Sequence, residues 1–236
     1  MPSPDSGPDS RQDSRGVASG LQHVVNWLFD MDNTLYPASA NLFSQIDRRM
    51  EAYVGKLLGL SRDEARVVQK RYFHEHGTTL RGLMLSHSVD PTDFLSFVHD
   101  IDMTVLTPDP ALRAGLLALP GRRILFTNGD ALYAARVLEA LDIQDCFEAI
   151  HDVVAMDYHP KPDPRAYAGL CRKHGLDPAA SFFADDMAYN LKPAKALGMS
   201  TLWINNGSER GDHGHHPDFV DDETHDLATW LQERLT

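Results

Sequence analysis

Short apolar runs alternate along the chain with segments whose apolar residues recur at helical spacing. Four runs have the length and composition of buried strands, at residues 24–29, 123–127, 181–184 and 200–204. We expect a fifth strand at 147–150 or 153–155, and a sixth at 218–220. Because strands that alternate with helices form parallel sheets, the pattern predicts an α/β fold with a Rossmann-like, doubly wound parallel sheet.

Helices are predicted between and after these strands, at residues 131–141, 164–174, 190–197 and 224–235. Gly175 and Gly198 directly follow two of these segments, and glycine commonly occupies the position after a helix C-terminus. The last segment is amphipathic, so we expect it to pack back on the core.

The alternation is interrupted between residues 38 and 108, where no run is typical of a strand. Helical spacing is found there at 41–58, 61–73, 79–87 and 91–101, and the second of these segments begins with the capping-box pattern Ser-Arg-Asp-Glu. Because the insertion directly follows the first predicted strand, we expect it to form a helical cap that acts as a lid. The alternative is a packing extension far from any chemistry.

The chain is therefore predicted to have three parts. Residues 1–20 are rich in Ser, Pro, Asp and Gly and are expected to form a disordered tail. Residues 21–37 and 109–236 are expected to form the α/β core, and residues 38–108 the helical cap.

Composition narrows the classes of partner. The 236 residues carry a formal net charge of −12, which gives no bulk attraction to a nucleic acid polymer or an anionic membrane. No apolar run approaches the roughly 18–20 residues that span a bilayer. The two cysteines, Cys146 and Cys171, lie far apart, which suits a reducing compartment, so we expect a cytoplasmic protein.

Two acids stand at the end of the first predicted strand. Asp30 and Asp32 are separated by one residue, and Thr34 follows with a hydroxyl. Carboxylates so close repel each other unless a cation or a shared proton accompanies them. Such a pair at a strand end indicates a carboxylate nucleophile, an acid/base partner and a divalent metal, whereas in isolation it is more typical of an Asp-rich turn.

Polar residues of matching type follow the other strands. Thr127, Asn128 and the exposed backbone at Gly129 are suited to bind an anion, although a strand-to-helix turn also explains them. Lys161 lies between prolines and can offset phosphate and carboxylate charge together. Alone, it is equally typical of a surface lysine.

The fourth run ends in Asp185 and Asp186. Oxygen ligands at the edge of a parallel sheet suit Mg²⁺, which binds few carboxylates and keeps several waters. Together, the strand ends predict an acidic metal site, an anion cradle and a lysine counter-charge.

With these four motifs in this order, the chain resembles the haloacid dehalogenase-like hydrolase superfamily from about residue 24 to its C-terminus. The resemblance implies that Asp30 is a nucleophile that forms an aspartyl-phosphate, and that Asp32 protonates the leaving alcohol and then activates water. It also implies that Thr127 and Lys161 are catalytic, and that Thr127, Asn128 and Lys161 bind the substrate phosphoryl group. The implied Mg²⁺ ligands are Asp30, the backbone carbonyl of Asp32, Asp186 and, directly or through a neighbour, Asp185.

Asp32 separates two branches of the superfamily. Its dehalogenases lack the acid two residues after the nucleophile and need no metal, so Asp32 favours phosphate-ester hydrolysis over 2-haloacid dehalogenation. Phosphomutases share the four motifs and remain an alternative. The resemblance also implies a cap of the C1 type, inserted after the first strand.

Three stretches, around Asp30, Gly77–Leu83 and Asp185, are similar to the pyrimidine 5′-nucleotidase branch. This similarity implies a UMP- or CMP-like nucleoside monophosphate as the phosphorylated substrate, which the cap residue Arg81 would contact. The alternatives are a phosphatase of another small metabolite, such as a sugar phosphate or phosphoglycolate, and a solvated position for Arg81. We expect a monomer or a homodimer.

Overall fold

The computed structural model describes residues 20–207 and 218–234. The tail predicted at residues 1–20 therefore lies outside the described residues, apart from Gly20. Within the described ranges, no helix is long and apolar enough to cross a membrane.

Six parallel strands form one sheet in the order β3-β2-β1-β4-β5-β6. Their bounds are β1 Asn26–Phe29, β2 Arg122–Phe126, β3 Ala149–His151, β4 Ser181–Asp185, β5 Ser200–Ile204 and β6 Asp222–Thr224. The central strand β1 is buried along its whole length, and its Leu28 stands in register with Ile124 and Phe183. The predicted doubly wound parallel sheet is confirmed.

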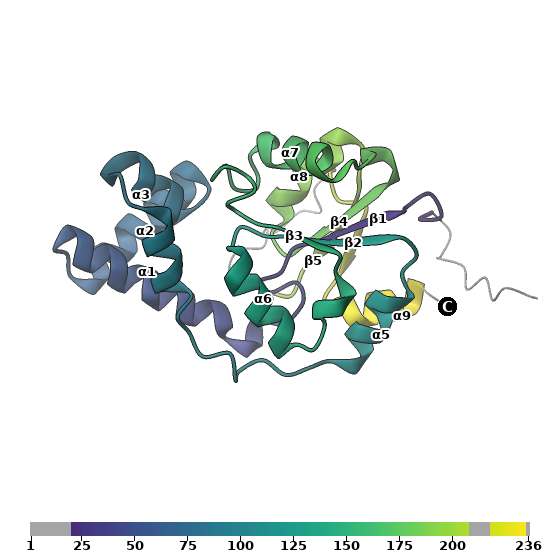
Figure 1. Cartoon of the computed structure of the whole chain (residues 1–236), viewed down its shortest axis with the longest axis horizontal. Coiled ribbons are helices and arrows are strands. Elements are labelled where there is room, and N and C mark those ends of the chain that lie inside the picture. Colours follow the sequence, from purple (N-terminus) through teal and green to yellow (C-terminus); the bar gives the residue numbers. More distant parts are fainter. Residues whose placement is uncertain (1–19, 208–217, 235–236) are drawn as a thin grey trace, which may run out of the picture.

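Helices cover both faces of the sheet (Figure 1). Helices α5 (Pro110–Ala118), α6 (Ala131–Ala140) and α9 (Leu227–Arg234) lie on one face, and α7 (Pro164–His174) and α8 (Ala188–Leu197) on the other. Successive strands run outward from β1 in one direction and from β4 in the other, so the order reverses between these two neighbours. Ligands of open α/β sheets bind beyond the carboxyl ends of the strands at such a reversal.

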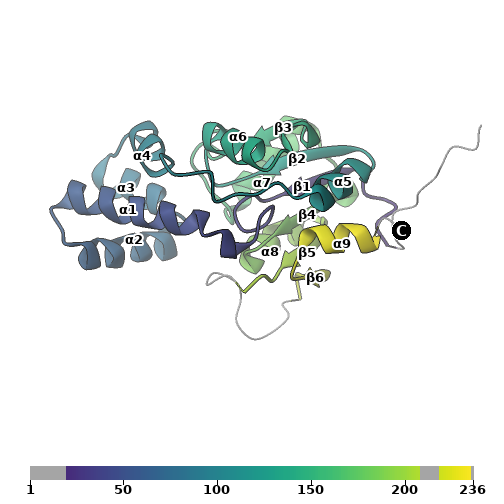
Figure 2. The same cartoon turned by 90° about the horizontal axis from the view of Figure 1, so that it is seen from below.

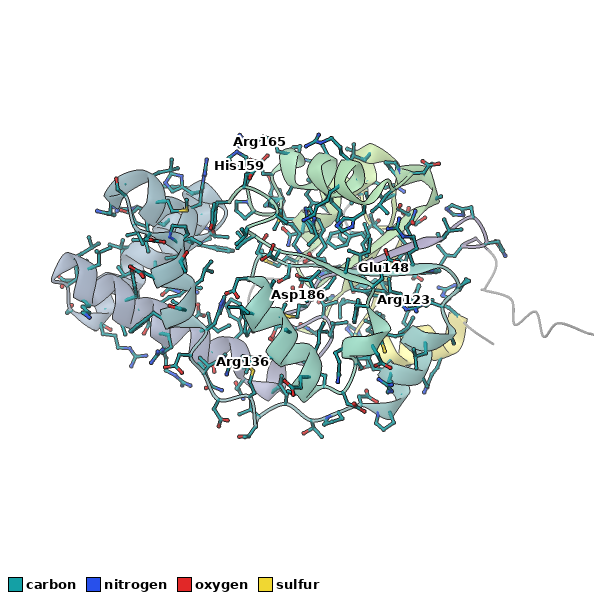
Figure 3. The ribbon with its side chains drawn as sticks, viewed as in Figure 1. Arg123, Arg136, Glu148, His159, Arg165 and Asp186 are labelled. Carbon is teal, nitrogen blue, oxygen red and sulfur yellow. The ribbon has the colours of Figure 1, made fainter. Side chains whose placement is uncertain are left out.

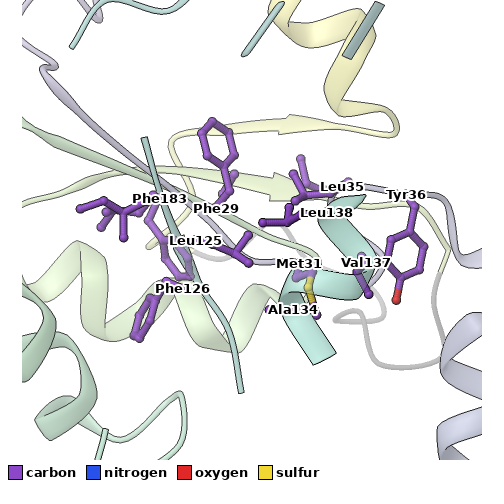
Figure 4. Close-up of a cluster of buried hydrophobic side chains, with 14 of the residues drawn as sticks. Phe29, Met31, Leu35, Tyr36, Leu125, Phe126, Ala134, Val137, Leu138 and Phe183 are labelled. Atoms are coloured by element: carbon purple, nitrogen blue, oxygen red, sulfur yellow. The ribbon is translucent and has the colours of Figure 1, made fainter. Parts of the chain in front are cut away.

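The core between β1, β2, β4 and α6 is packed by aromatic and aliphatic side chains (Figure 4). Phe29, Leu125 and Phe126 are fully buried, and the Phe126 and Phe183 rings lie 5.5 Å apart. Burial of this kind stabilises the fold by about 1.5–3 kcal/mol for each large apolar side chain, and it holds the strand ends at fixed positions.

Four helices form a separate group beside the sheet, α1 (Leu42–Leu58), α2 (Arg62–His76), α3 (Thr79–His87) and α4 (Pro91–Val98). Figures 1 and 2 show them beyond the end of the sheet, packed on one another. The capping box predicted at the start of α2 is present, between Ser61 and Glu64. Gly82 of α3 allows a close approach to α2, because a Cβ there would lie 2.4 Å from Cγ of Tyr72.

Two element predictions need correction. The sixth strand lies at Asp222–Thr224 and not at 218–220. It is a polar, half-buried strand at the edge of the sheet, and among the described residues it pairs with β5 alone. Such a strand has no apolar run by which the sequence could reveal it. Helix α5 was not predicted, although its start signals are present in the N-cap Asp109 and in Pro110 at the first position.

The other elements lie close to their predicted positions. Strand β3 overlaps the first of its two predicted positions, and helices α3, α7 and strand β5 match their predicted bounds. Helix α9 begins at Leu227, three residues later than predicted, because Thr224 belongs to β6.

Candidate active site

The strand ends bring the predicted acids together. Asp30 follows β1, and Asp185 and Asp186 lie at the end of β4, its direct neighbour in the sheet. One carboxylate oxygen from each of the three lies within 4.8 Å of the others, and all three residues are buried. Figure 3 shows Asp186 at the end of the sheet that faces the four-helix group. The cluster therefore occupies the reversal point between β1 and β4.

Lys161 is the cation of this cluster. It is 1% exposed, and its Nζ donates to Asp30 Oδ1 at 2.7 Å, to Asp185 Oδ2 at 2.8 Å and to the carbonyl of Phe126 at 2.8 Å. Burial alone would lower the pKa of Lys161, but the charges of Asp185 and Asp30 outweigh it and raise the pKa. The ammonium therefore stays charged and holds the two carboxylates in place.

Asn128 positions the lysine. Its side-chain Nδ2 donates to the carbonyl of Lys161 at 3.1 Å, and its Oδ1 accepts from the Lys161 backbone N–H at 2.8 Å. Asn128 was predicted to bind substrate, and the structure shows its amide engaged with the lysine backbone. Thr127 is fully buried at the end of β2, where its Oγ1 accepts from the N–H of Gly129 at 3.0 Å.

Asp185 and Asp186 have different surroundings. Asp185 is fully buried and accepts hydrogen bonds from Lys161, from the N–H of Met187 and from Asn190 Nδ2. Burial raises the pKa of Asp185, and Lys161 opposes that shift. Asp186 Oδ2 accepts from Asn33 Nδ2 at 3.4 Å. The donors around Asp185 leave its carboxylate less available to bind a metal ion.

The donor set of the cluster fits the expected metal. Three carboxylates at the edge of a parallel sheet offer hard oxygen ligands, which Mg²⁺ prefers. Lys161 offsets part of their charge, so the carboxylates remain close together in the protein alone.

Asp32 lies apart from the three-carboxylate cluster and is held by two phenols. Its Oδ1 accepts from Tyr36 at 2.5 Å and from Tyr133 at 2.6 Å. Burial, and next the charge of Asp30, raises the pKa of Asp32, while the two tyrosine hydrogen bonds act in the opposite direction. A carboxyl group that retains a proton more readily than usual is suited to act as a general acid.

Residues around Asp32 were not predicted from the sequence. Tyr133 stacks on His99 at a centroid distance of 4.1 Å, and His99 Nδ1 lies 2.5 Å from Asp130 Oδ2. His99 directly follows α4, so it links the four-helix group to the core. Tyr36, four residues after Asp32, is visible as a candidate in the sequence, whereas Tyr133 reaches Asp32 only through the packing of α6 beside β1.

A cavity of about 110 Å³ lies between the strand ends and the four helices. Its strand-end side includes Asp30, Asp32, Lys161 and Asp186. Its helix side is mostly apolar and includes Phe43, Ile46, Met50, Phe73, Leu80, Phe94, Leu95 and Val98. The cavity therefore has room for an apolar group of a ligand next to the carboxylates and the lysine.

Arg81 does not line this cavity. It lines a neighbouring, more open hollow of about 790 Å³, together with Lys161, Asn128 and Asn190. The arginine is therefore on the same side of the molecule as the lysine, and its predicted contact with substrate requires a ligand that extends into this hollow.

Fold and site together define an α/β protein with three carboxylates and a buried lysine at the point where the strand order reverses. Residues 27–198 match the family model of the haloacid dehalogenase-like hydrolases, and the chain belongs to this family. The superfamily prediction is confirmed, and the narrower pyrimidine 5′-nucleotidase branch stays a prediction.

Two curated relatives carry names related to phosphate chemistry. The chain is 29% identical over 191 residues to "Phosphate metabolism protein 8" of Saccharomyces cerevisiae, an alignment that covers 73% of this chain and only 59% of the yeast protein. It is 27% identical over 240 residues to a "Phosphoglycolate phosphatase" of Salmonella typhimurium, which covers 89% of this chain and 94% of that protein.

Solved structures share the fold. A haloacid dehalogenase-like phosphatase from Thermococcus onnurineus superposes with a TM-score of 0.60 at 18% identity, covering 88% of this chain and 96% of that one. An L-2-haloacid dehalogenase from Xanthobacter autotrophicus superposes with a TM-score of 0.57 at 17% identity, covering 89% and 97%. At such identities the similarity shows the fold alone.

Proposed function

We propose that this protein is a Mg²⁺-dependent phosphomonoesterase that acts through an aspartyl-phosphate. The observation that carries the proposal is the buried Lys161 ammonium between Asp30 and Asp185, with Asp186 in the same cluster. A carboxylate and a phosphate ester are both negatively charged and repel each other. A fixed lysine and a divalent cation bound beside them offset this repulsion. Phosphatase-named relatives support the same class of reaction.

In the first step, the Asp30 carboxylate attacks phosphorus and the bond from phosphorus to the leaving oxygen breaks. Asp32, held by Tyr36 and Tyr133, gives its proton to that oxygen, and the alcohol leaves. Lys161 keeps the Asp30 carboxylate oriented, and the Thr127 hydroxyl, whose oxygen accepts from the Gly129 N–H, can donate its hydrogen to a phosphoryl oxygen.

In the second step, water attacks phosphorus, and the Asp32 carboxylate takes the proton of that water. The bond between phosphorus and the Asp30 oxygen breaks, which releases inorganic phosphate and restores both carboxyl groups to their starting state. Asp30, Asp186 and the Asp32 carbonyl would hold Mg²⁺, which would supply positive charge that lowers the repulsion between the carboxylate and the phosphoryl group.

We also propose that residues 38–108 act as the cap of this site. The cavity is closed on one side by α1, α2, α3 and α4, so these helices decide which leaving groups fit and exclude water.

A pyrimidine nucleoside monophosphate is the first substrate that we propose. The apolar helix side of the cavity suits a planar base, and the adjoining open hollow with Arg81 gives room for a larger group. The second candidate is phosphoglycolate, which is favoured by the relatives of that name that match almost their full length. The carboxylate of phosphoglycolate would need a cation on the mostly apolar helix side of the cavity.

The test is phosphate release from UMP, CMP, sugar phosphates and 2-phosphoglycolate, with Mg²⁺, with a chelator, and with Mg²⁺ restored. We expect release that a chelator abolishes and Mg²⁺ restores. If sugar phosphates or phosphoglycolate react well while UMP and CMP react poorly, the nucleotide assignment is wrong. Halide release from 2-chloropropionate that a chelator does not affect would instead indicate a dehalogenase.

A further inference from the structure

Gln69 is an unusual residue for its position in the helix. The inner face of α2 buries Ala65, Gln69 and Tyr72, and Gln69 is only 2% exposed. A carboxamide on a buried helix face needs partners for both its amino group and its oxygen. The side chain also lines the cavity that contains Asp30 and Lys161.

One half of this carboxamide is paired. Gln69 Nε2 donates to Asp47 Oδ1 of α1 at 2.9 Å. Because a carboxylate accepts hydrogen bonds and donates none, Asp47 fixes which end of the amide faces it. The oxygen of Gln69 must therefore point away from Asp47, and rotation of the amide cannot give it this partner.

The other half has no partner. Gln69 Oε1 is buried, and no hydrogen-bond donor of the described residues reaches it. Buried polar atoms are almost always paired, so an unpaired acceptor on a residue that lines a cavity points to a donor from a water or a ligand. Most of its neighbours on that wall are apolar, and the other polar residues of the helix side are Lys70, Thr78, Thr79 and His99.

We propose that Gln69 Oε1 accepts a hydrogen bond from an N–H or O–H group on the leaving alcohol of the substrate. The enzyme would thereby select phosphate esters whose leaving group carries such a donor at its far end. The inference rests on the proposed phosphomonoesterase function, and it adds the chemical class of the leaving group and the residue that reads it.

The same geometry disfavours a leaving group that ends in a carboxylate. Such an anion would meet the Gln69 oxygen, with the Asp47 carboxylate behind it. Lys70 also lines the cavity, but its Nζ lies 3.9 Å from Asp47 Oδ2, which draws its charge toward that acid. An anionic leaving group bound by Lys70 is the competing outcome.

The experiment compares kcat/KM for four phosphate esters of three kinds. UMP and CMP carry N–H donors on the base, p-nitrophenyl phosphate has no donor on its leaving group, and 2-phosphoglycolate carries a carboxylate. In the Gln69→Leu variant we expect kcat/KM for UMP and CMP to fall about 10-fold or more, and that for p-nitrophenyl phosphate to change less than about 2-fold. The measured quantity is the ratio between the two, so a general loss of active protein cancels.

A second variant tests the orientation of the amide. In Asp47→Asn the new side-chain amide can donate a hydrogen bond to Gln69 Oε1, which then has a partner within the protein. We expect the same change in the substrate ratio, but smaller. Gln45→Leu is the matched control, because Gln45 of α1 pairs with the backbone of Asp102 and does not line the cavity.

The outcomes separate this inference from the proposed function. Equal changes for all esters in Gln69→Leu, or a wild-type preference for 2-phosphoglycolate that the variant retains, overturn the role of Gln69 alone. Absence of phosphate release from every ester by the wild-type protein overturns both. The substitution removes an unpaired buried acceptor but also the hydrogen bond from Gln69 Nε2 to Asp47, so we expect a melting temperature close to that of the wild type, and a large fall would indicate a structural role instead.

Discussion

The two sides of the cavity are built from opposite chemistry. The strand-end side carries Asp30, Asp186 and the Lys161 ammonium, whose three hydrogen bonds hold it in place. The helix side is mostly apolar, and its polar residues include the Gln69 carboxamide and Lys70. The charged side belongs to the sheet and its loops, and the apolar side belongs to helices inserted between β1 and β2.

This difference separates the reaction from the choice of substrate. Strand ends are held by the buried core, so the charges between them keep fixed distances, as a reaction at phosphorus needs. Helix side chains can change without moving those charges. Variants on the two sides should therefore behave differently, with loss of turnover from the strand-end side and altered selectivity from the helix side.

The largest effect is expected from Asp30→Asn. The amide keeps the size of the side chain but removes the nucleophile, so phosphate release should fall by a factor on the order of 10⁴ or more with every ester. Steady-state phosphate release with Mg²⁺ measures the loss, and circular dichroism checks the fold.

Asp145→Asn is the matched control. Asp145 is exposed, pairs with Arg113 and does not line the cavity. The variant should therefore be as active as the wild type. Substantial phosphate release by Asp30→Asn would contradict the nucleophile role and would place the reaction on another residue.

Lys161→Met should reduce both activity and stability. Methionine preserves the packing of the stem between Phe126 and Phe183, but it leaves two buried carboxylates without their cation. Removal of one partner from a buried ion pair costs about 3–5 kcal/mol in the free energy of unfolding. We expect turnover to fall on the order of 100-fold and the melting temperature to drop by about 10 °C.

Thermal unfolding and phosphate release measure these two effects, with Lys192→Met, at an exposed position of α8, as the control. If Lys161→Met retains wild-type stability and turnover, the charged side of the cavity does not depend on this ion pair.

A smaller effect is expected from Tyr133→Phe. The variant removes one of the two phenols on Asp32 Oδ1 and keeps the ring that stacks on His99. A hydrogen bond to a carboxylate contributes about 1.5–3 kcal/mol to stability, so the melting temperature should fall by several degrees. Because Asp32 loses one of its two fixed partners, kcat should fall about 10-fold or more, with little change in KM. Tyr36→Phe should behave alike, because Tyr36 donates to the same oxygen.

Tyr72→Phe serves as the control, since Tyr72 pairs with His87 away from Asp32. A change in KM that exceeds the change in kcat would show that Tyr133 acts on substrate binding and not on the position of Asp32.

Much of the fold was predictable because its elements carry local signals. The bounds of α7 follow from an apolar stripe that ends before Gly175, and the start of α2 follows from the capping box at Ser61. Strand β6 gave no such signal, because an edge strand of Asp, Glu and Thr buries little surface.

The residues of the charged side were visible as well, because chemistry at strand ends requires acids, a hydroxyl and a lysine at defined places in the chain. Their identity is local, so Asp30, Lys161 and Asp186 could be named before their distances were known. The helix side offered no comparable pattern. Arg81 was selected for its charge, yet it lines the neighbouring hollow and not the cavity.

The sequence by itself determined the alternation of strands and helices, the insertion after β1 and the acids and lysine that the proposed reaction needs. These depend on hydrophobic periodicity and on residue type, which are properties of short segments. Only the tertiary structure decided that Tyr133 reaches Asp32, that Asn128 holds the lysine, and that Asp47 leaves the Gln69 oxygen unpaired. Each of these contacts joins segments whose distance in space is set by the packing of the whole core, and no local pattern encodes that distance.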